Sequence, residues 1–125
     1  MNQLLLIFLG GGLGSLTRFF LGKTIQERAG ADFPVGTLGV NVAASLVLGF
    51  FIGLVEAKNL ANPAFRALVA VGFCGGFSTF STFANDNVLL LLDQRPWAAL
   101  LNIALSVTLC IVATFGGLWL GKISV

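Results

Sequence analysis

The sequence predicts an all-α integral membrane protein of four transmembrane helices, and three observations lead to that fold class. Of its 125 residues, 57% are hydrophobic and only 10% are charged, so a water-soluble fold could not cover its apolar surface. Four apolar stretches reach or approach the roughly 20 residues that an α-helix needs to cross a bilayer. Their side chains are apolar on nearly every face, which indicates helices and not the alternating strands of a membrane barrel.

The apolar stretches divide the chain into one predicted transmembrane domain over residues 1–125. Its four spans are expected at residues 4–21, 35–55, 64–92 (with a polar interruption) and 97–120. Three short polar connections separate them, at residues 22–34, 56–63 and 93–96. The first span is interpreted as retained and not as a cleaved signal peptide, because no Lys or Arg precedes it and no small-residue cleavage site follows a short apolar core.

Positive residues near the span ends are divided evenly between the two sides of the membrane. One side carries Lys58, Arg66 and Lys122, and the other carries Lys23, Arg28 and Arg95. Cytoplasmic loops normally hold the excess of Lys and Arg, so an even count removes the usual orientation signal. Two interpretations stay open: one orientation prevails by a small margin, or the chain inserts both ways and forms an antiparallel homodimer.

The composition argues against an enzyme and against a metal site built from histidine or cysteine. The chain has no His, and none of its five carboxylates lies well inside an uninterrupted apolar run. Cys74 and Cys110 fall in different spans without an imidazole partner, so neither a thiolate metal site nor a disulfide framework is indicated. Any ion site must therefore use oxygen or amide groups.

The most informative segment is GFCGGFSTFSTF at residues 72–83, where glycines and hydroxyls interrupt an apolar span. The helix is predicted to break here, and non-helical backbone at membrane depth persists only where its polar groups find partners. Alternatively, the small residues form only a helix-packing surface. Phe80 and Phe83 lie three apart on one helical face, either as core residues or with their positive ring edges turned toward the path of a small anion.

Polar residues in the other spans allow the same two kinds of interpretation. A stripe along the fourth span is formed by Asn102, Ser106, Cys110 and Thr114, which recur every four residues. Interhelical hydrogen bonds explain one or two such residues, whereas four in register favour a hydrated pathway. Asn41 is either a lock between helices or a pore donor, and Arg18 either snorkels or draws anions into a vestibule.

These features resemble the Fluc (CrcB) family of bacterial fluoride channels over essentially the whole chain. The resemblance is carried by the glycine-rich first span ending at Arg18, by GTLGVN ending at Asn41, and by GGFSTFSTF at residues 75–83. It implies a passive, fluoride-selective channel that exports cytoplasmic fluoride across the bacterial inner membrane. It also implies a dual-topology antiparallel homodimer with two pores, whose partners are a second copy and the lipid bilayer and not nucleic acid.

The resemblance also assigns roles to individual residues. Eight of them are expected to line the fluoride pores: Asn41, Phe80, Ser81, Thr82, Phe83, Ser106, Cys110 and Thr114. Among these, Phe80 and Phe83 form an edge-on aromatic box beside the Asn41 amide. A structural sodium ion at the dimer centre is expected to bind the main-chain carbonyls of Gly75 and Ser78.

Two rival functions remain open from the sequence. A proton-coupled exporter, like the small multidrug resistance proteins, needs a membrane-embedded carboxylate that binds proton and cation alternately. No acidic residue lies in the first, second or fourth span, and Asp86 follows the aromatic motif near a polar end. A non-transporting assembly subunit would explain the glycines and hydroxyls through packing alone.

Overall fold

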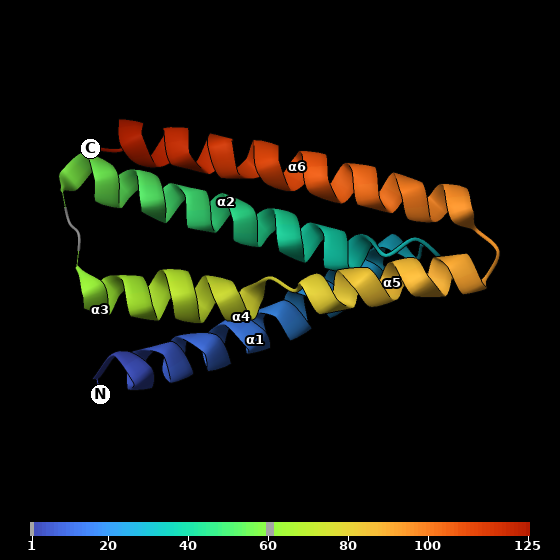
Figure 1. The fold of residues 1–125 in the computed structure, drawn as a ribbon, viewed down its shortest axis with the longest axis horizontal. Helices are drawn as coiled ribbons and strands as arrows, with labels where there is room; N and C mark the ends of the chain where they lie inside the picture. The colour runs from blue at the N-terminus through green and yellow to red at the C-terminus, as the bar shows by residue number, and fades with distance from the viewer. Residues whose placement is uncertain (1, 60–61) are drawn as a thin grey trace.

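The computed structural model describes residues 2–59 and 62–125, and all regular structure in that part of the chain is helical (Figure 1). The elements are α1 (Asn2–Ala29), α2 (Val35–Lys58), α3 (Pro63–Phe65), η1 (Arg66–Cys74), α4 (Gly75–Phe77), α5 (Phe80–Leu92) and α6 (Pro96–Ile123). Four stretches are long and apolar enough to cross a membrane: α1, α2, the run from α3 to α5, and α6. The prediction of an all-helical chain with four such segments is confirmed.

Helix α1 is longer than the apolar stretch from which it was predicted. It continues through Lys23, Gln26 and Glu27, into the polar connection expected at residues 22–34. These residues favour helix, and the Lys23 ammonium lies 3.9 Å from the Glu27 carboxylate one turn later. The helix ends where Gly30 adopts a left-handed φ of +57° and its N–H donates to the Gln26 carbonyl at 3.2 Å.

The helices pack as two close pairs, α2 with α6 and α1 with η1 and α4 (Figure 1). Pairs of glycines four positions apart lie in the contacts: Gly10 and Gly14, Gly49 and Gly53, Gly72 and Gly76, and Gly117 and Gly121. A methyl group at Gly49 would overlap the Thr114 carbonyl oxygen, and one at Gly117 would overlap that of Leu46. Small residues at these spacings let membrane helices approach until their backbones touch.

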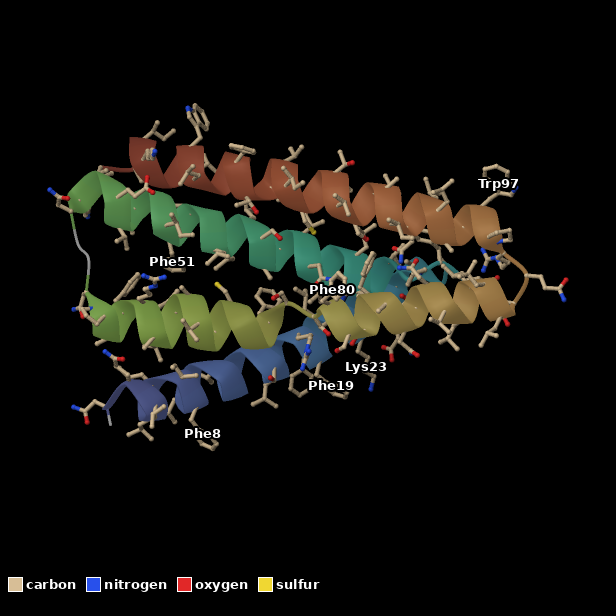
Figure 2. All side chains as sticks on the ribbon, viewed as in Figure 1. Phe8, Phe19, Lys23, Phe51, Phe80 and Trp97 are labelled. Carbon is tan, nitrogen blue, oxygen red and sulfur yellow. The ribbon has the colours of Figure 1, made fainter. Side chains whose placement is uncertain are left out.

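Large apolar side chains cover the outside of the bundle. Phe8 on α1 and Trp97 on α6 are 76% and 80% exposed and point away from the other helices (Figure 2). The start of α1 and the end of α6 lie at the same end of the molecule (Figure 1). An apolar exterior of this kind suits lipid, which identifies the chain as a multi-pass membrane protein.

The run from α3 to α5 contains two departures from regular α-helix. Its first half contains η1, a nine-residue π-helix with wider turns, which no feature of the sequence predicts. The second departure lies between α4 and α5, where Ser78 and Thr79 have extended backbones, with ψ angles of 157° and 113°. Helix α5 then starts at Phe80, capped by the Thr79 hydroxyl, which accepts a hydrogen bond from the Thr82 N–H at 3.2 Å.

Candidate functional site

A side-chain amide on α2 holds the extended backbone between α4 and α5. The Asn41 Oδ1 atom accepts from the Thr79 N–H at 2.8 Å, and the Asn41 Nδ2 atom donates to the Thr79 carbonyl at 3.1 Å. The backbone N–H and carbonyl of Thr79 therefore both have hydrogen-bond partners, although Thr79 lies outside a helix. These hydrogen bonds connect α2 to the third span, and the pore role of Asn41 stays a prediction. A second Nδ2 hydrogen remains for other acceptors.

The extended backbone also leaves main-chain carbonyls at residues 75–78 without their helical donors, among them those of Gly75 and Ser78. In a continuous α-helix each N–H donates to the carbonyl four residues earlier, so Thr79 and Thr82 would donate to Gly75 and Ser78. Instead, the Thr79 N–H bonds to the α2 amide and the Thr82 N–H bonds to the Thr79 hydroxyl. The carbonyls of Gly75 and Ser78 thereby lose their usual helical donors. The neighbouring Cys74 carbonyl, by contrast, accepts from both the N–H and the hydroxyl of Ser78, each at 3.0 Å.

A cavity of about 260 Å³, here called the central cavity, lies beside this segment. Its lining residues come from α2, α5, α6 and the extended segment: Asn41, Ser45, Ser78, Thr79, Phe80, Phe83, Ser106, Val107 and Cys110. The structure thus brings together five of the eight residues expected in a pore. Hydroxyl, amide and thiol groups share the cavity with two phenyl rings, and among the described residues its lining carries no formal charge.

The other three expected pore residues do not line the central cavity, and Thr82 lines a different, larger one. The hydroxyls of Ser81 and Thr82 lie 3.3 Å and 3.0 Å from the Thr79 hydroxyl, and both residues are exposed. The Thr114 hydroxyl donates to the carbonyl of Cys110 in its own helix at 2.8 Å. The stripe on α6 therefore reaches the central cavity at Ser106 and Cys110, and the pore roles of these three outer residues stay predictions.

The two phenyl rings of the central cavity lie close together at the start of α5. The ring centroids of Phe80 and Phe83 are 5.5 Å apart, with an angle of 46° between the ring planes. Phe80 is 79% exposed within one chain, and Figure 2 shows it at the beginning of α5, next to the extended segment. Most of this ring is therefore available to a neighbouring chain or to lipid.

A second, larger cavity of about 620 Å³ lies among α1, α2 and α5 and contains Arg18. Three acidic residues share it, Asp32, Asp86 and Asp93, so it holds more negative than positive side chains. The Oδ2 atom of Asp86 is buried without a hydrogen-bond partner in residues 2–59 and 62–125. Arg18 thus lies among carboxylates and apart from the phenyl pair, and its role in a vestibule stays a prediction.

Sequence reasoning missed one buried polar residue, Asn87. Its Nδ2 atom donates to the Phe83 carbonyl at 3.0 Å, and its Oδ1 atom accepts from Asn102 Nδ2 at 3.0 Å. The Ser106 hydroxyl in turn donates to Asn102 Oδ1 at 3.3 Å. The signal in the sequence is the polar triplet Asn85, Asp86 and Asn87, which lies inside an apolar span.

Fold and site together define a multi-pass membrane protein with a cavity lined by amide, hydroxyl, thiol and phenyl groups beside the extended residues 78–79. The chain belongs to the CrcB-like protein family (Camphor Resistance, CrcB), whose model matches residues 5–118. Three relatives each carry the name fluoride-specific ion channel FluC. The protein from Flavobacterium psychrophilum is 38% identical over 122 residues, 98% of either chain. Those from Pseudoalteromonas translucida and Rhizobium meliloti are both 41% identical, covering 92% and 94% of this chain and 96% and 94% of their own.

Proposed function

We propose that this chain is a passive, fluoride-selective ion channel and not an enzyme. The family and the names of the three relatives support this function. The observation that carries it in the structure is the central cavity, whose described lining offers amide, hydroxyl and ring-edge donors without a formal charge. Such donors can replace water around a small anion, yet they release it more readily than a fixed cation would.

The physiological role follows from the chemistry of fluoride. Its conjugate acid is weak and neutral, so it crosses membranes from an acidic medium and dissociates inside, where the anion is trapped by the bilayer. A passive channel lets the trapped anion leave the cytoplasm down its electrochemical gradient. The residues proposed to guide it are Phe80, Phe83, Ser106 and Cys110 of the central cavity, with the remaining Asn41 amide hydrogen as a further donor.

The extended segment is proposed to act as a functional break in the third transmembrane helix, where a structural sodium ion binds. Carbonyl oxygens suit hard cations, and those of Gly75 and Ser78 are among the four, at residues 75–78, that lack their usual helical donors. A Cβ atom added at Gly75 would meet nothing within 4 Å among the described residues, so the space beside it is open. A bound cation would interact favourably with the carbonyl oxygens of Gly75 and Ser78, so both carbonyls suit the role of ligand.

The working unit is proposed to be an antiparallel, dual-topology homodimer in the bacterial inner membrane, with residues 1–125 of each copy forming one transmembrane domain. The even division of Lys and Arg supports insertion in both orientations. The exposed Phe80 ring and the open space at Gly75 support a second copy at the extended segment. Partners other than this copy and the bilayer, nucleic acid included, are not expected.

Topology can be tested by labelling single cysteines in cells with a membrane-impermeant thiol reagent. In a chain lacking Cys74 and Cys110, we expect Ser124→Cys to be labelled at about half of its molecules from outside and completely after permeabilisation. Asp32→Cys lies in a connection predicted on the other side and should give the same half-labelling. Complete labelling of one site with protection of the other would contradict dual topology.

Function is tested by fluoride efflux from liposomes that contain the purified protein, followed with a fluoride electrode beside a chloride control. We expect rapid efflux selective for fluoride, and we expect Phe80→Ile to slow it at least about tenfold, because an aliphatic side chain has no positive ring edge. Phe8→Ile makes the same change at an outward-facing position of α1 and should leave the rate unchanged.

Two outcomes would contradict the proposed channel. Well-folded dimers that carry no fluoride would favour an assembly subunit. Efflux that requires a proton gradient and is lost in Asp86→Asn would indicate a proton-coupled exporter, since Asp86 is a carboxylate inside the third span.

A further inference from the structure

In the hydrogen bonds that link α5 to α6, each group can act only as donor or only as acceptor, and the Phe83 backbone carbonyl determines which. The Phe83 carbonyl can only accept, so the Asn87 side chain must present its Nδ2 atom there. Asn87 therefore presents Oδ1 to α6 and receives the Nδ2 hydrogen of Asn102. Asn102 is then left with Oδ1 facing Ser106, whose hydroxyl must be the donor.

Burial keeps this direction fixed. Asn87, Asn102 and Ser106 are all buried, and Asn102 is only 2% exposed. Turning either amide around would place oxygen against oxygen or nitrogen against nitrogen, and a buried polar group without a partner is strongly unfavourable. The two amides could reverse only together, and the Phe83 carbonyl prevents that.

The direction matters because Ser106 also lines the central cavity beside Phe80 and Phe83. Its hydroxyl hydrogen is directed at Asn102, so only oxygen lone pairs are left for the cavity. An anion there needs a donor, and Ser106 can become one only by rotating its hydroxyl away from Asn102. The buried Oδ1 atom of Asn102 then loses its donor.

We propose that Asn102, oriented by Asn87, is a positioning residue that competes with the transported anion for the Ser106 hydroxyl hydrogen. The competition lowers the affinity of the central cavity for fluoride and so favours release. This inference rests on the proposed function of the chain as a fluoride channel. Conduction requires binding that is strong enough for entry and weak enough for exit, and the two amides shift that balance toward exit.

A simpler role is a lock that only holds α5 against α6. A lock predicts that loss of Asn102 changes stability, and that any effect on transport is the same whether or not Ser106 has its hydroxyl. Competition predicts an effect on fluoride affinity that requires this hydroxyl. The two roles therefore differ in a double-mutant cycle.

The test measures fluoride efflux from liposomes over a range of fluoride concentrations for four proteins: the unchanged chain, Asn102→Leu, Ser106→Ala and the double variant. We expect Asn102→Leu to lower the half-saturating fluoride concentration about tenfold, because the hydroxyl no longer has a competing acceptor. Its maximal rate should stay level or fall. In the Ser106→Ala background the same substitution should leave the half-saturating concentration unchanged.

A second variant tests the same step if Asn102→Leu does not fold. Asn87→Leu leaves Asn102 in place but removes the group that orients it, so the amide can turn and donate to Ser106, which frees the hydroxyl hydrogen. We expect a lower half-saturating concentration here too, whereas Asn85→Leu, at an exposed position of α5, should behave like the unchanged chain.

The outcomes separate this inference from the proposed function. If the unchanged chain carries fluoride but neither substitution alters the half-saturating concentration, or if Asn102→Leu shifts it equally without the Ser106 hydroxyl, the competition is overturned and the channel stands. If the unchanged chain carries no fluoride, the proposed function fails, and the inference fails with it.

Discussion

Asn41→Asp is expected to reduce fluoride efflux by about a hundredfold or more and to destabilise the protein by about 2 kcal/mol. A carboxylate at this position can still accept from the Thr79 N–H, but it cannot donate to the Thr79 carbonyl, which would then face a negative oxygen. The same charge borders the central cavity and repels an entering anion. Efflux from liposomes and thermal unfolding in detergent measure the two effects.

The matched control is Asn59→Asp, which makes the same change at the exposed end of α2. Asn59 has a left-handed φ of 55°, a conformation that Asp tolerates nearly as well as Asn. Both transport and stability should match the unchanged chain. Full efflux from Asn41→Asp would show that neither the lock on Thr79 nor the neutrality of the cavity is needed.

Gly117→Val is expected to prevent the native fold. The added Cβ atom would overlap the Leu46 carbonyl oxygen on α2, where the two backbones touch. Relief requires α2 and α6 to separate along a contact that also includes Gly49 and Gly53, and overpacking by smaller amounts already costs about 1–3 kcal/mol. The yield of monodisperse protein in size-exclusion chromatography should fall to near zero.

The adjacent residue, Gly116, offers a control in which the same side chain points away from α2. At Gly116 an added Cβ atom would meet nothing within 4 Å among the described residues, so Gly116→Val adds the same side chain on an open side of α6. Its yield should match that of the unchanged chain. Equal yields from the two variants would mean that the close approach of α2 and α6 does not sustain the fold.

The fold class could be predicted because it depends on the number of apolar residues in each stretch, which a sequence states directly. The boundaries of the helices depend on more than the length of these apolar stretches. Helix α1 extends beyond its apolar stretch because Lys23, Gln26 and Glu27 belong to residue types whose helix propensity is close to that of leucine. The π-helix η1 packs against α1, and no single residue in Arg66–Cys74 predicts it.

Within the candidate site, the sequence identified the polar groups but could not assign their partners. Asn41 invited two interpretations because the residue that it bonds lies 38 positions away. Asn102 was grouped with the stripe on α6 by its spacing, whereas its main partner is Asn87 on another helix. Spacing reports which residues share one helical face, and contacts between helices are decided by packing that one helix does not encode.

The lock between Asn41 and Thr79 also bears on the order in which the protein is made. Chains are synthesised from the N-terminus, so α2 reaches the bilayer before residues 78–79 leave the ribosome. The amide that satisfies their exposed N–H and carbonyl is therefore already in place when these groups enter hydrocarbon, where unmet polar groups are costly. With the order of these helices reversed, the irregular segment would enter the membrane before its acceptor and donor existed.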